Sequence, residues 1–333
     1  MNKNFFKNKV ILITGGTGSF GKALVKHLLN KKYPLRKIII FSRDELKQSN
    51  FQNTLSSKHN KLLRFFIGDV RDIDRLRTAF EDVDYVIHAA ALKQVPAAEY
   101  NPIEFIKTNV LGTQNIISSC LEKKVKAAIL LSTDKASSPI NLYGATKLCA
   151  DKLFISANNI KGKNNIKFSV VRYGNVMGSR GSVIENFIRQ KANGKLNLTD
   201  PEMTRFNMLI EEAVDLVLWT LEKSIGGELI VPKIPSFNVK DLAKAIGGNI
   251  KHEITGIRPG EKLHEEMISV YDSPNTLEFK NFYMILPNNL LKYYKNKGKK
   301  VKKNFVYNSL NNKKFLSVSQ LIDKVKKLGF KIK

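Results

Sequence analysis

The chain has 333 residues, of which 43% are hydrophobic and 26% charged, as in a globular protein of one large or two ordinary domains. No apolar run reaches the roughly 18 residues needed to span a bilayer, so no membrane span is expected. The net charge of +27 comes from dispersed lysines that form no reader motif, so we expect no nucleic-acid partner. The two cysteines have neither metal-ligand nor disulfide spacing, which predicts no metal site and a cytoplasmic location.

A glycine-rich turn near the N-terminus predicts a dinucleotide site. Residues 10–14, VILIT, form a buried strand that runs directly into G-x-x-G-x-x-G and then a helical pattern through residue 29. Glycines lack a Cβ atom, so the turn can be tight and its N–H groups can approach a pyrophosphate at the start of the helix. The residues predicted to contact the cofactor here are Gly15, Thr17, Gly18, Ser19, Phe20 and Gly21.

The end of the second predicted strand, residues 37–42, indicates which dinucleotide is bound. NAD-preferring folds place an acid there, about 20 residues after the glycines, to bind the ribose 2′-hydroxyl. Ser42 and Arg43 instead suit a 2′-phosphate, although Asp44 follows directly. We therefore predict NADP as the cofactor, with these three residues and Lys47 near its ribose.

Two more strands, at 65–68 and 83–88, are expected to place further residues around the cofactor. Parallel sheets collect ligands at the carboxyl ends of their strands, and small residues there let the backbone lie close to the cofactor. His88, at the end of the second of these strands, is expected to be a packed residue rather than a catalyst. The predicted cofactor contacts are Asp69, Val70, Ala89, Ala90, Ala91 and Lys93.

A set of proton-handling groups follows the fifth predicted strand, 128–132. Thr133, Asp134 and Lys135 come directly after that strand, and Tyr143 and Lys147 lie four residues apart on the next predicted helix. Residues at this spacing share one helix face, and a lysine cation beside a phenol lowers the pKa of the phenol. An isolated Tyr-x-x-x-Lys is also common on solvated helix faces, so the glycine loop upstream is what favours a catalytic function.

The alternation of strands and helices, with a sixth strand at 168–173, predicts an α/β fold with a doubly wound parallel sheet. We expect a dinucleotide-binding domain at 1–177, to which about 205–232 returns, and a substrate-binding region at 178–290. Residues 291–333 contain 14 lysines and one acid and form a tail with a terminal helix at about 319–328. A helix is expected at 211–222, a strand at 228–231 and another helix at 239–245.

Three arginines in Gly-rich or loop settings are candidate phosphate ligands. Arg180, Arg205 and Arg258 each carry a planar guanidinium that binds phosphate oxygens in pairs, so a diphosphate clamp is one interpretation. Solvated arginines are the alternative.

These residues lie in an ordered series of motifs that resembles a known family. The motifs are TGGTGSFGK, SRDELKQ, FFIGDVRD, HAAALKQVPAAEYNP, STDKASSPINLYGATKLCADKLF, VVRYGNVMGSRGSV, MTRF and GIRPGEKLHE. They resemble the extended short-chain dehydrogenases/reductases that act on nucleotide sugars, and more narrowly the inverting UDP-N-acetylglucosamine 4,6-dehydratases of pseudaminic acid biosynthesis. Asn207 departs from the family pattern, which commonly has an aromatic residue after MTRF. The related capsule-type dehydratase/5-epimerases typically carry Met in place of Tyr143.

The resemblance implies a Rossmann domain with a smaller C-terminal substrate-binding domain, NADP as the cofactor and UDP-N-acetylglucosamine as the substrate. It implies that Tyr143 takes the 4-hydroxyl proton, assisted by Lys147 and Thr133, that Lys135 takes the carbon 5 proton, and that Asp134 helps the 6-hydroxyl depart. A homo-oligomer built from dimers, possibly a hexamer, is expected. The implied substrate contacts are Lys93, Asn175, Arg180, Gly181, Ser182, Thr204, Arg205, Arg258 and Glu261. Val176, Tyr143 and Lys147 are implied cofactor contacts.

Three other functions remain open from the sequence. A nucleotide-sugar 4-epimerase would use Tyr143 and Lys147 but would not need Asp134 and Lys135. An NADP-binding regulator would need the glycine loop without the complete catalytic set. A basic nucleic-acid-binding protein would show steep salt dependence of binding.

Overall fold

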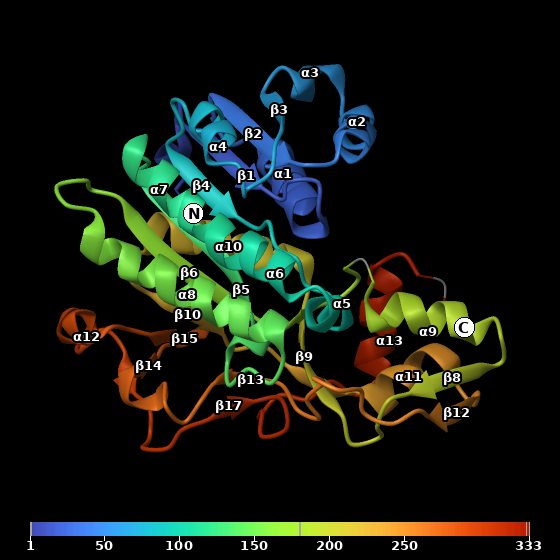
Figure 1. The fold of residues 1–333 in the computed structure, drawn as a ribbon. Helices are drawn as coiled ribbons and strands as arrows, with labels where there is room; N and C mark the ends of the chain where they lie inside the picture. Colours follow the sequence, from blue (N-terminus) through green and yellow to red (C-terminus); the bar gives the residue numbers. More distant parts are fainter. Residues whose placement is uncertain (1, 180, 331, 333) are drawn as a thin grey trace.

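A parallel sheet formed by the first part of the chain is the base of the fold (Figure 1). The computed structural model describes residues 2–179, 181–330 and 332. Six parallel strands lie in the order β3-β2-β1-β4-β5-β6. From β1 the chain adds β2 and β3 on one side of the sheet, and it then adds β4, β5 and β6 on the other side. This doubly wound order confirms the predicted fold class. The strands are β1 (Val10–Thr14), β2 (Lys37–Ser42), β3 (Leu63–Ile67), β4 (Tyr85–His88), β5 (Ala127–Thr133) and β6 (Lys167–Tyr173).

The central strands are buried because helices cover both faces of the sheet. All five residues of β1 are buried, as a continuous apolar run in a parallel sheet predicts. His88 is buried as expected, between the hydroxyls of Thr14 and Thr113. The connecting elements are α1 (Ser19–Asn30), α2 (Glu45–Asn53), α3 (Ser57–Asn60), α4 (Ile73–Ala79), α5 (Val95–Tyr100), α6 (Pro102–Phe105), η2 (Ile106–Leu111), α7 (Gly112–Glu122), η3 (Asp134–Ala136) and α8 (Leu142–Ile160), after a first turn, η1 (Lys3–Phe6).

Later parts of the chain extend the same sheet beyond β6. The strand β10 (Leu229–Pro232) lies parallel to β6. Next come β15 (Phe282–Ile285), β14 (Thr276–Glu278) and β16 (Lys299–Lys300), each antiparallel to the strand before it in the sheet. Residues 276–300 therefore belong to the large sheet, whereas the sequence placed them in the substrate region and the tail. These short strands lack a clear alternating pattern, and pairing with β10 covers an edge that would otherwise be open.

A second, smaller unit packs around its own apolar core. Figure 1 shows α9 (Val183–Lys191), α11 (Val239–Gly247) and α13 (Val318–Lys327) beside the strands β8 (Lys195–Leu198) and β12 (Lys251–Ile254). Phe187, Leu196, Leu242 and Leu321 are among its buried side chains. The terminal helix expected at 319–328 is α13, and it is part of this unit. The domain boundaries predicted from the sequence remain a proposal.

Short strands and helices connect the two units. A three-stranded sheet contains β7 (Asn175–Val176), β9 (Thr204–Met208) and β11 (Ser236–Asn238), and β13 (Glu266–Ile268) pairs with β17 (Tyr307–Asn308). The remaining elements are α10 (Ile210–Lys223), η4 (Ser273–Asn275) and α12 (Asn288–Tyr294). No helix within the described part of the chain is long and apolar enough to cross a bilayer.

Candidate active site

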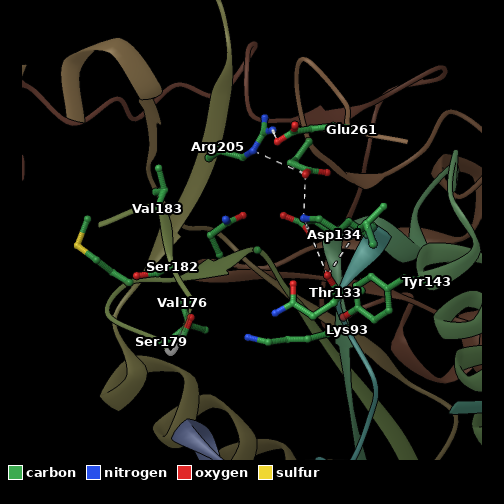
Figure 2. A pocket seen from close by; sticks show the side chains of 18 of the residues that line it. Lys93, Thr133, Asp134, Tyr143, Val176, Ser179, Ser182, Val183, Arg205 and Glu261 are labelled. Atoms are coloured by element: carbon green, nitrogen blue, oxygen red, sulfur yellow. Dashed lines mark hydrogen bonds and ion pairs between the residues drawn. The ribbon is translucent and has the colours of Figure 1, made fainter. Parts of the chain in front are cut away.

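A cavity of about 920 Å³ lies where the carboxyl ends of the parallel strands face the smaller unit. This is the usual ligand position in an open α/β sheet, and the volume suits a small-molecule site. Figure 2 shows Thr133 and Tyr143 on one side of the cavity and Val176, Ser179, Ser182 and Val183 on the other. The side chain of Lys93 extends into the space between them.

The glycine loop has the shape that a dinucleotide requires. Gly15 has φ +65°, and a Cβ atom there would lie 2.9 Å from the backbone of Ala90. Helix α1 begins at Ser19 beside this turn, so the positive N-terminal end of the helix dipole lies at the cavity. The loop residues that line the cavity are Gly15, Gly18, Ser19, Phe20 and Gly21, together with Ala89, Ala91 and Lys93 after β4. Thr17 and Ala90 do not line it, and Thr17 is buried.

The residues predicted around the ribose lie at the end of β2 and the start of α2, outside the cavity lining. Ser42 is buried and its hydroxyl accepts a hydrogen bond from Gln48 at 3.0 Å. Asp44 caps α2 by accepting from the backbone N–H of Lys47, so its carboxylate is already occupied. Arg43 is half-exposed, with its guanidinium 3.6 Å from Asp69. At the end of β2, the half-exposed side chain is therefore the Arg43 cation, while the Asp44 carboxylate caps α2.

Asp69 and Val70, which the sequence predicted as cofactor contacts, follow the end of β3. Asp69 accepts from both the backbone and the guanidinium of Arg71. Burial raises the pKa of Asp69, but Arg71 and Arg43 outweigh burial and keep that pKa low. Val70 is buried next to it.

All five predicted catalytic residues line the cavity together. Thr133 ends β5, and its hydroxyl donates to Asp134 at 3.0 Å. The ammonium of Lys135 lies 3.1 Å from the same carboxylate oxygen and 2.8 Å from Glu265. Both acids are nearly inaccessible to solvent, with side chains 1% and 2% exposed.

The start of α8 places the tyrosine and lysine against the end of β5. Asn141 caps the helix by accepting from the N–H of Gly144 at 2.7 Å. A Cβ atom at Gly144 would lie only 2.2 Å from the carbonyl oxygen of Lys135, so only glycine permits this approach. As a result Tyr143 shares a hydrogen bond with Thr133, and Lys147 donates to the carbonyl of Leu131 at 2.7 Å.

The electrostatics of Tyr143 differ from the sequence prediction. Burial raises the pKa of Tyr143 to about 12, while Lys135 and the Thr133 hydroxyl act in the opposite direction. The sequence assigned that lowering effect to Lys147, but its ammonium is directed to the Leu131 carbonyl. Burial lowers the pKa of Lys147 to about 8, against the attraction of Asp151. The protein without cofactor therefore holds a neutral phenol.

The Asp134–Lys135 pair is electrostatically coupled to Glu265. Burial lowers the pKa of Lys135, but the charges of Asp134 and Glu265 outweigh burial and raise it above its usual value. Burial and Glu265 both raise the pKa of Asp134. The sequence analysis did not single out Glu265, although it ends the motif GIRPGEKLHE.

Two arginines of the predicted clamp, Arg205 and Arg258, form ion pairs with Glu261. Figure 2 shows Arg205 and Glu261 side by side at one edge of the cavity. Arg205 is buried and lies 3.4 Å from Glu261, which is also 3.0 Å from Arg258. Arg205 and Arg258 line the cavity, and so do Asn175, Val176, Gly181, Ser182 and Glu261. Arg180 lies outside the described residues.

Thr204 is the one described substrate residue that the structure keeps out of the cavity lining. Successive side chains of a strand point to opposite faces, and in β9 Arg205 and Asn207 take the cavity face. The Thr204 hydroxyl instead bonds Ser309 at 2.7 Å and His264 at 2.9 Å. Its position is structural.

The smaller unit adds polar lining residues that the sequence did not indicate. They come from α9, β8 and the loops after β8 and β12, and they are Asn186, Gln190, Asn197, Thr199 and Thr255. Asn207 also lines the cavity and is buried, and its side-chain amide donates to the sulfur of Met177 at 3.8 Å. Within the described residues, no group of His, Cys, Asp and Glu could hold a metal ion.

The fold and the site together define an extended short-chain dehydrogenase/reductase with a Rossmann-type sheet. The chain belongs to the polysaccharide biosynthesis protein family, whose model matches residues 11–287. A UDP-N-acetylglucosamine 4,6-dehydratase (inverting) from Campylobacter jejuni strain 81-176 is 53% identical over 329 residues, covering 96% of this chain and 97% of that protein.

Two further relatives cover almost the whole chain. A UDP-glucose 4-epimerase from Rickettsia bellii strain OSU 85-389 is 42% identical over 320 residues, covering 93% of each protein. The crystal structure of Pen from Bacillus thuringiensis superposes with a TM-score of 0.88 at 38% identity, covering 97% of this chain and 99% of that one. Full-length similarity of this kind confirms the family resemblance drawn from the motifs.

The buried ammonium of Lys147 should destabilise the protein without cofactor. A cation whose folded pKa is lowered from 10.5 to about 8 destabilises the fold below about pH 8, and the penalty disappears as the pH rises toward 10.5. Lys147→Met should therefore raise the free energy of unfolding at about pH 7 by up to roughly 3 kcal/mol, and by much less at about pH 10. Denaturant unfolding at both pH values measures this, with the exposed Lys152→Met as the control. A loss of stability in Lys147→Met at neutral pH would contradict the expectation.

Proposed function

We propose that the chain is an NADP-dependent hydro-lyase, a UDP-N-acetylglucosamine 4,6-dehydratase that inverts carbon 5. The observation that carries this proposal is that the Asp134–Lys135 pair and Tyr143 line one cavity beside the glycine loop. The Campylobacter relative, 53% identical and named for this reaction, supports it. The product would be UDP-2-acetamido-2,6-dideoxy-beta-L-arabino-hex-4-ulose, as in pseudaminic acid-type pathways.

The glycine loop, the residues after β4 and Arg43 would hold the cofactor. A bound nicotinamide would accept a hydride from carbon 4 of the sugar and later return one to carbon 6. In this arrangement Tyr143 would take the proton of the 4-hydroxyl. The Thr133 hydroxyl, which lies beside Tyr143, would hydrogen-bond the same 4-hydroxyl oxygen. A positive charge nearby would favour the phenolate and so oppose the effect of burial on the pKa of Tyr143.

The elimination needs a base and an acid on the same face of the sugar. Once carbon 4 is a ketone, the hydrogen on carbon 5 lies next to a carbonyl and can leave as a proton. Lys135 would take that proton and Asp134 would protonate the departing 6-hydroxyl. Carbon 5 is then reprotonated from the opposite face, which gives the inverted sugar.

The substrate diphosphate would lie near the arginines that line the cavity. Arg205 and Arg258 carry guanidinium groups suited to it, with Glu261 orienting both. Asn175, Gly181, Ser182 and Lys93 are the other proposed contacts among the described residues. The prediction for Arg180 is retained as a proposal.

A 4-epimerase is the second candidate, because relatives 42% identical carry that name. It would use Tyr143 and Lys147, but its chemistry gives no use to a buried Asp134–Lys135 pair. A capsule-type dehydratase/5-epimerase is disfavoured because Tyr143 is present. The predicted cytoplasmic location and the predicted homo-oligomer, built from dimers and possibly a hexamer, stay predictions.

The product of turnover distinguishes these candidates. Incubated with UDP-N-acetylglucosamine, the protein should give a product lighter than the substrate by one water, with no net consumption of NADP. Mass spectrometry of the nucleotide sugar and the absorbance of the cofactor measure both. An unchanged mass would support epimerisation, and stoichiometric reduction of added NADP would contradict a redox-neutral reaction.

The cofactor preference has a separate test at the end of β2. Arg43→Ala should weaken NADP binding by about 10-fold or more and NAD binding only slightly, because the guanidinium is expected to meet the 2′-phosphate. Titration calorimetry with each dinucleotide measures the two affinities. Lys47→Ala is a useful comparison, since its ammonium is paired with Asp44. Equal losses for both dinucleotides in Arg43→Ala would show that this arginine does not select NADP.

Two substitutions can distinguish the proposed roles of Tyr143 and Lys135. Tyr143→Phe removes the acceptor of the 4-hydroxyl proton, so bound NADP should stay oxidised when substrate is added. Lys135→Met removes the proposed base, so the cofactor should be reduced while the 6-hydroxyl is retained. In deuterated water the wild-type product should carry deuterium at carbon 5, and Lys135→Met should show almost no exchange. Near wild-type exchange in that variant would assign the base to another group.

A further inference from the structure

Asn207 is a buried amide on the wall of the cavity, and it has no role in the chemistry proposed above. It belongs to β9 and is 1% exposed. Its side chain lines the cavity, and its Oδ1 atom has no hydrogen-bond partner among the described residues. A buried carbonyl oxygen without a donor costs free energy, so an unpaired one at a ligand cavity indicates a donor that arrives with the ligand.

The contact on the other side of the amide decides which of its atoms is left free. The side-chain N–H of Asn207 donates to the sulfur of Met177 at 3.8 Å. A thioether sulfur can accept a weak hydrogen bond but cannot donate one, so the amide nitrogen faces Met177 and the oxygen does not. Met177 also lines the cavity. This part of the wall therefore combines a hydrogen-bond acceptor with an apolar, polarizable side chain.

The strand places Asn207 next to the proposed diphosphate site. Residues i and i+2 of a strand lie on one face, about 7 Å apart, so Asn207 follows Arg205 on the cavity face of β9. On the neighbouring strand β7, Asn175 is paired with Asn207 in parallel register and lines the cavity too. Arg205 and Asn175 are both proposed substrate contacts, Arg205 for the diphosphate. In a nucleotide sugar the diphosphate is attached to carbon 1, and carbon 2 is the next ring carbon.

We propose that Asn207 is a specificity-determining residue, whose amide oxygen accepts a hydrogen bond from the N–H of a 2-acetamido group on the sugar. The methyl of that group would then pack against Met177. An acetamido group combines a donor with an apolar methyl, as this wall combines an acceptor with a thioether. This inference rests on the proposed function, because it names the substituent by which the proposed site would select its UDP-sugar.

A 2-hydroxyl group matches this wall less well than an acetamido group does. A hydroxyl could donate to the same oxygen, but it would leave Met177 without a contact and would leave room for a water molecule. An acetamido group fills that space, so its N–H would stay buried and unpaired if the acceptor were removed. Loss of the Asn207 amide should therefore cost an acetamido sugar more than a 2-hydroxyl sugar.

The test separates the hydrogen bond from the shape of the ligand. Titration calorimetry compares UDP-N-acetylglucosamine with an analogue in which a methylene group replaces the acetamido N–H. The full-length protein is loaded with NADPH, which cannot accept a hydride and therefore prevents turnover. The wild-type protein should bind the analogue at least about 10-fold more weakly, because the analogue has no donor for Asn207. Asn207→Leu keeps a similar side-chain size without the amide, so it should lose this preference.

Thr204→Val is the matched control for a disturbance of β9. Thr204 lies on the opposite face of the same strand, where its hydroxyl bonds Ser309 and His264. This variant should keep the wild-type ratio of the two affinities, whatever it does to their absolute values. A second readout is turnover with NADP: the preference in kcat/KM for UDP-N-acetylglucosamine over UDP-glucose should fall about 10-fold in Asn207→Leu and stay unchanged in Thr204→Val.

Three outcomes would overturn the assignment. They are equal binding of the two ligands by the wild-type protein, an undiminished preference in Asn207→Leu, and loss of the preference in Thr204→Val. The first needs no variant, so it tests the proposal even if Asn207→Leu folds poorly. A wild-type protein that shows the expected preference but releases no water would instead refute the proposed dehydration, a result separate from these.

Discussion

The catalytic centre depends on how closely helix α8 begins against the end of β5. A Cβ atom at Gly144 would lie 2.2 Å from the Lys135 carbonyl oxygen, so the contact exists only because that position is glycine. A larger residue would push the helix away and carry Tyr143 from Thr133 and Lys147 from the Leu131 carbonyl. Deeper in the helix, Asp151 pairs with the buried Arg172 at 3.0 Å and accepts from Ser132 at 2.8 Å. Breaking such a buried pair costs about 3–5 kcal/mol, so α8 is firmly attached to both β5 and β6.

The second constraint is charge balance in a place that excludes water. A lone buried ion is far less stable than a paired one, and the catalytic pair already contains one acid and one base. Glu265 would leave an excess negative charge if Arg205 did not lie beside it. Arg205 in turn donates to the Thr204 and Leu263 carbonyls and to Glu261. The polar groups of the cavity therefore depend on one another. Burial also disfavours the charge of Lys147, whose pKa falls to about 8 despite the attraction of Asp151.

The sequence predicted the parts of the fold and site that depend on local pattern. The strands at 10–14 and 37–42 have the predicted bounds, because each is a continuous apolar run. The five predicted catalytic residues could be grouped from the sequence because they occur within fifteen positions of one another. Glu265 could not, because it reaches Lys135 from 130 residues further along the chain. The strands of residues 276–300 were missed for the same reason. Thr204 lies outside the cavity lining because side chains alternate along β9.

Four charged side chains meet at the predicted catalytic site, and they come from separate parts of the chain. Asp134 and Lys135 belong to the end of the parallel sheet, whereas Arg205 comes from β9 and Glu265 from the segment before β13. Glu265 is held there by Ser309, which is itself tied to Thr204, so three separated segments meet behind the catalytic pair. The Rossmann part alone would hold Lys135 with one acid and no neighbouring arginine. The ion pairs of Lys135 with Glu265 and of Glu265 with Arg205 form only when the later segments have packed against β5 and α8.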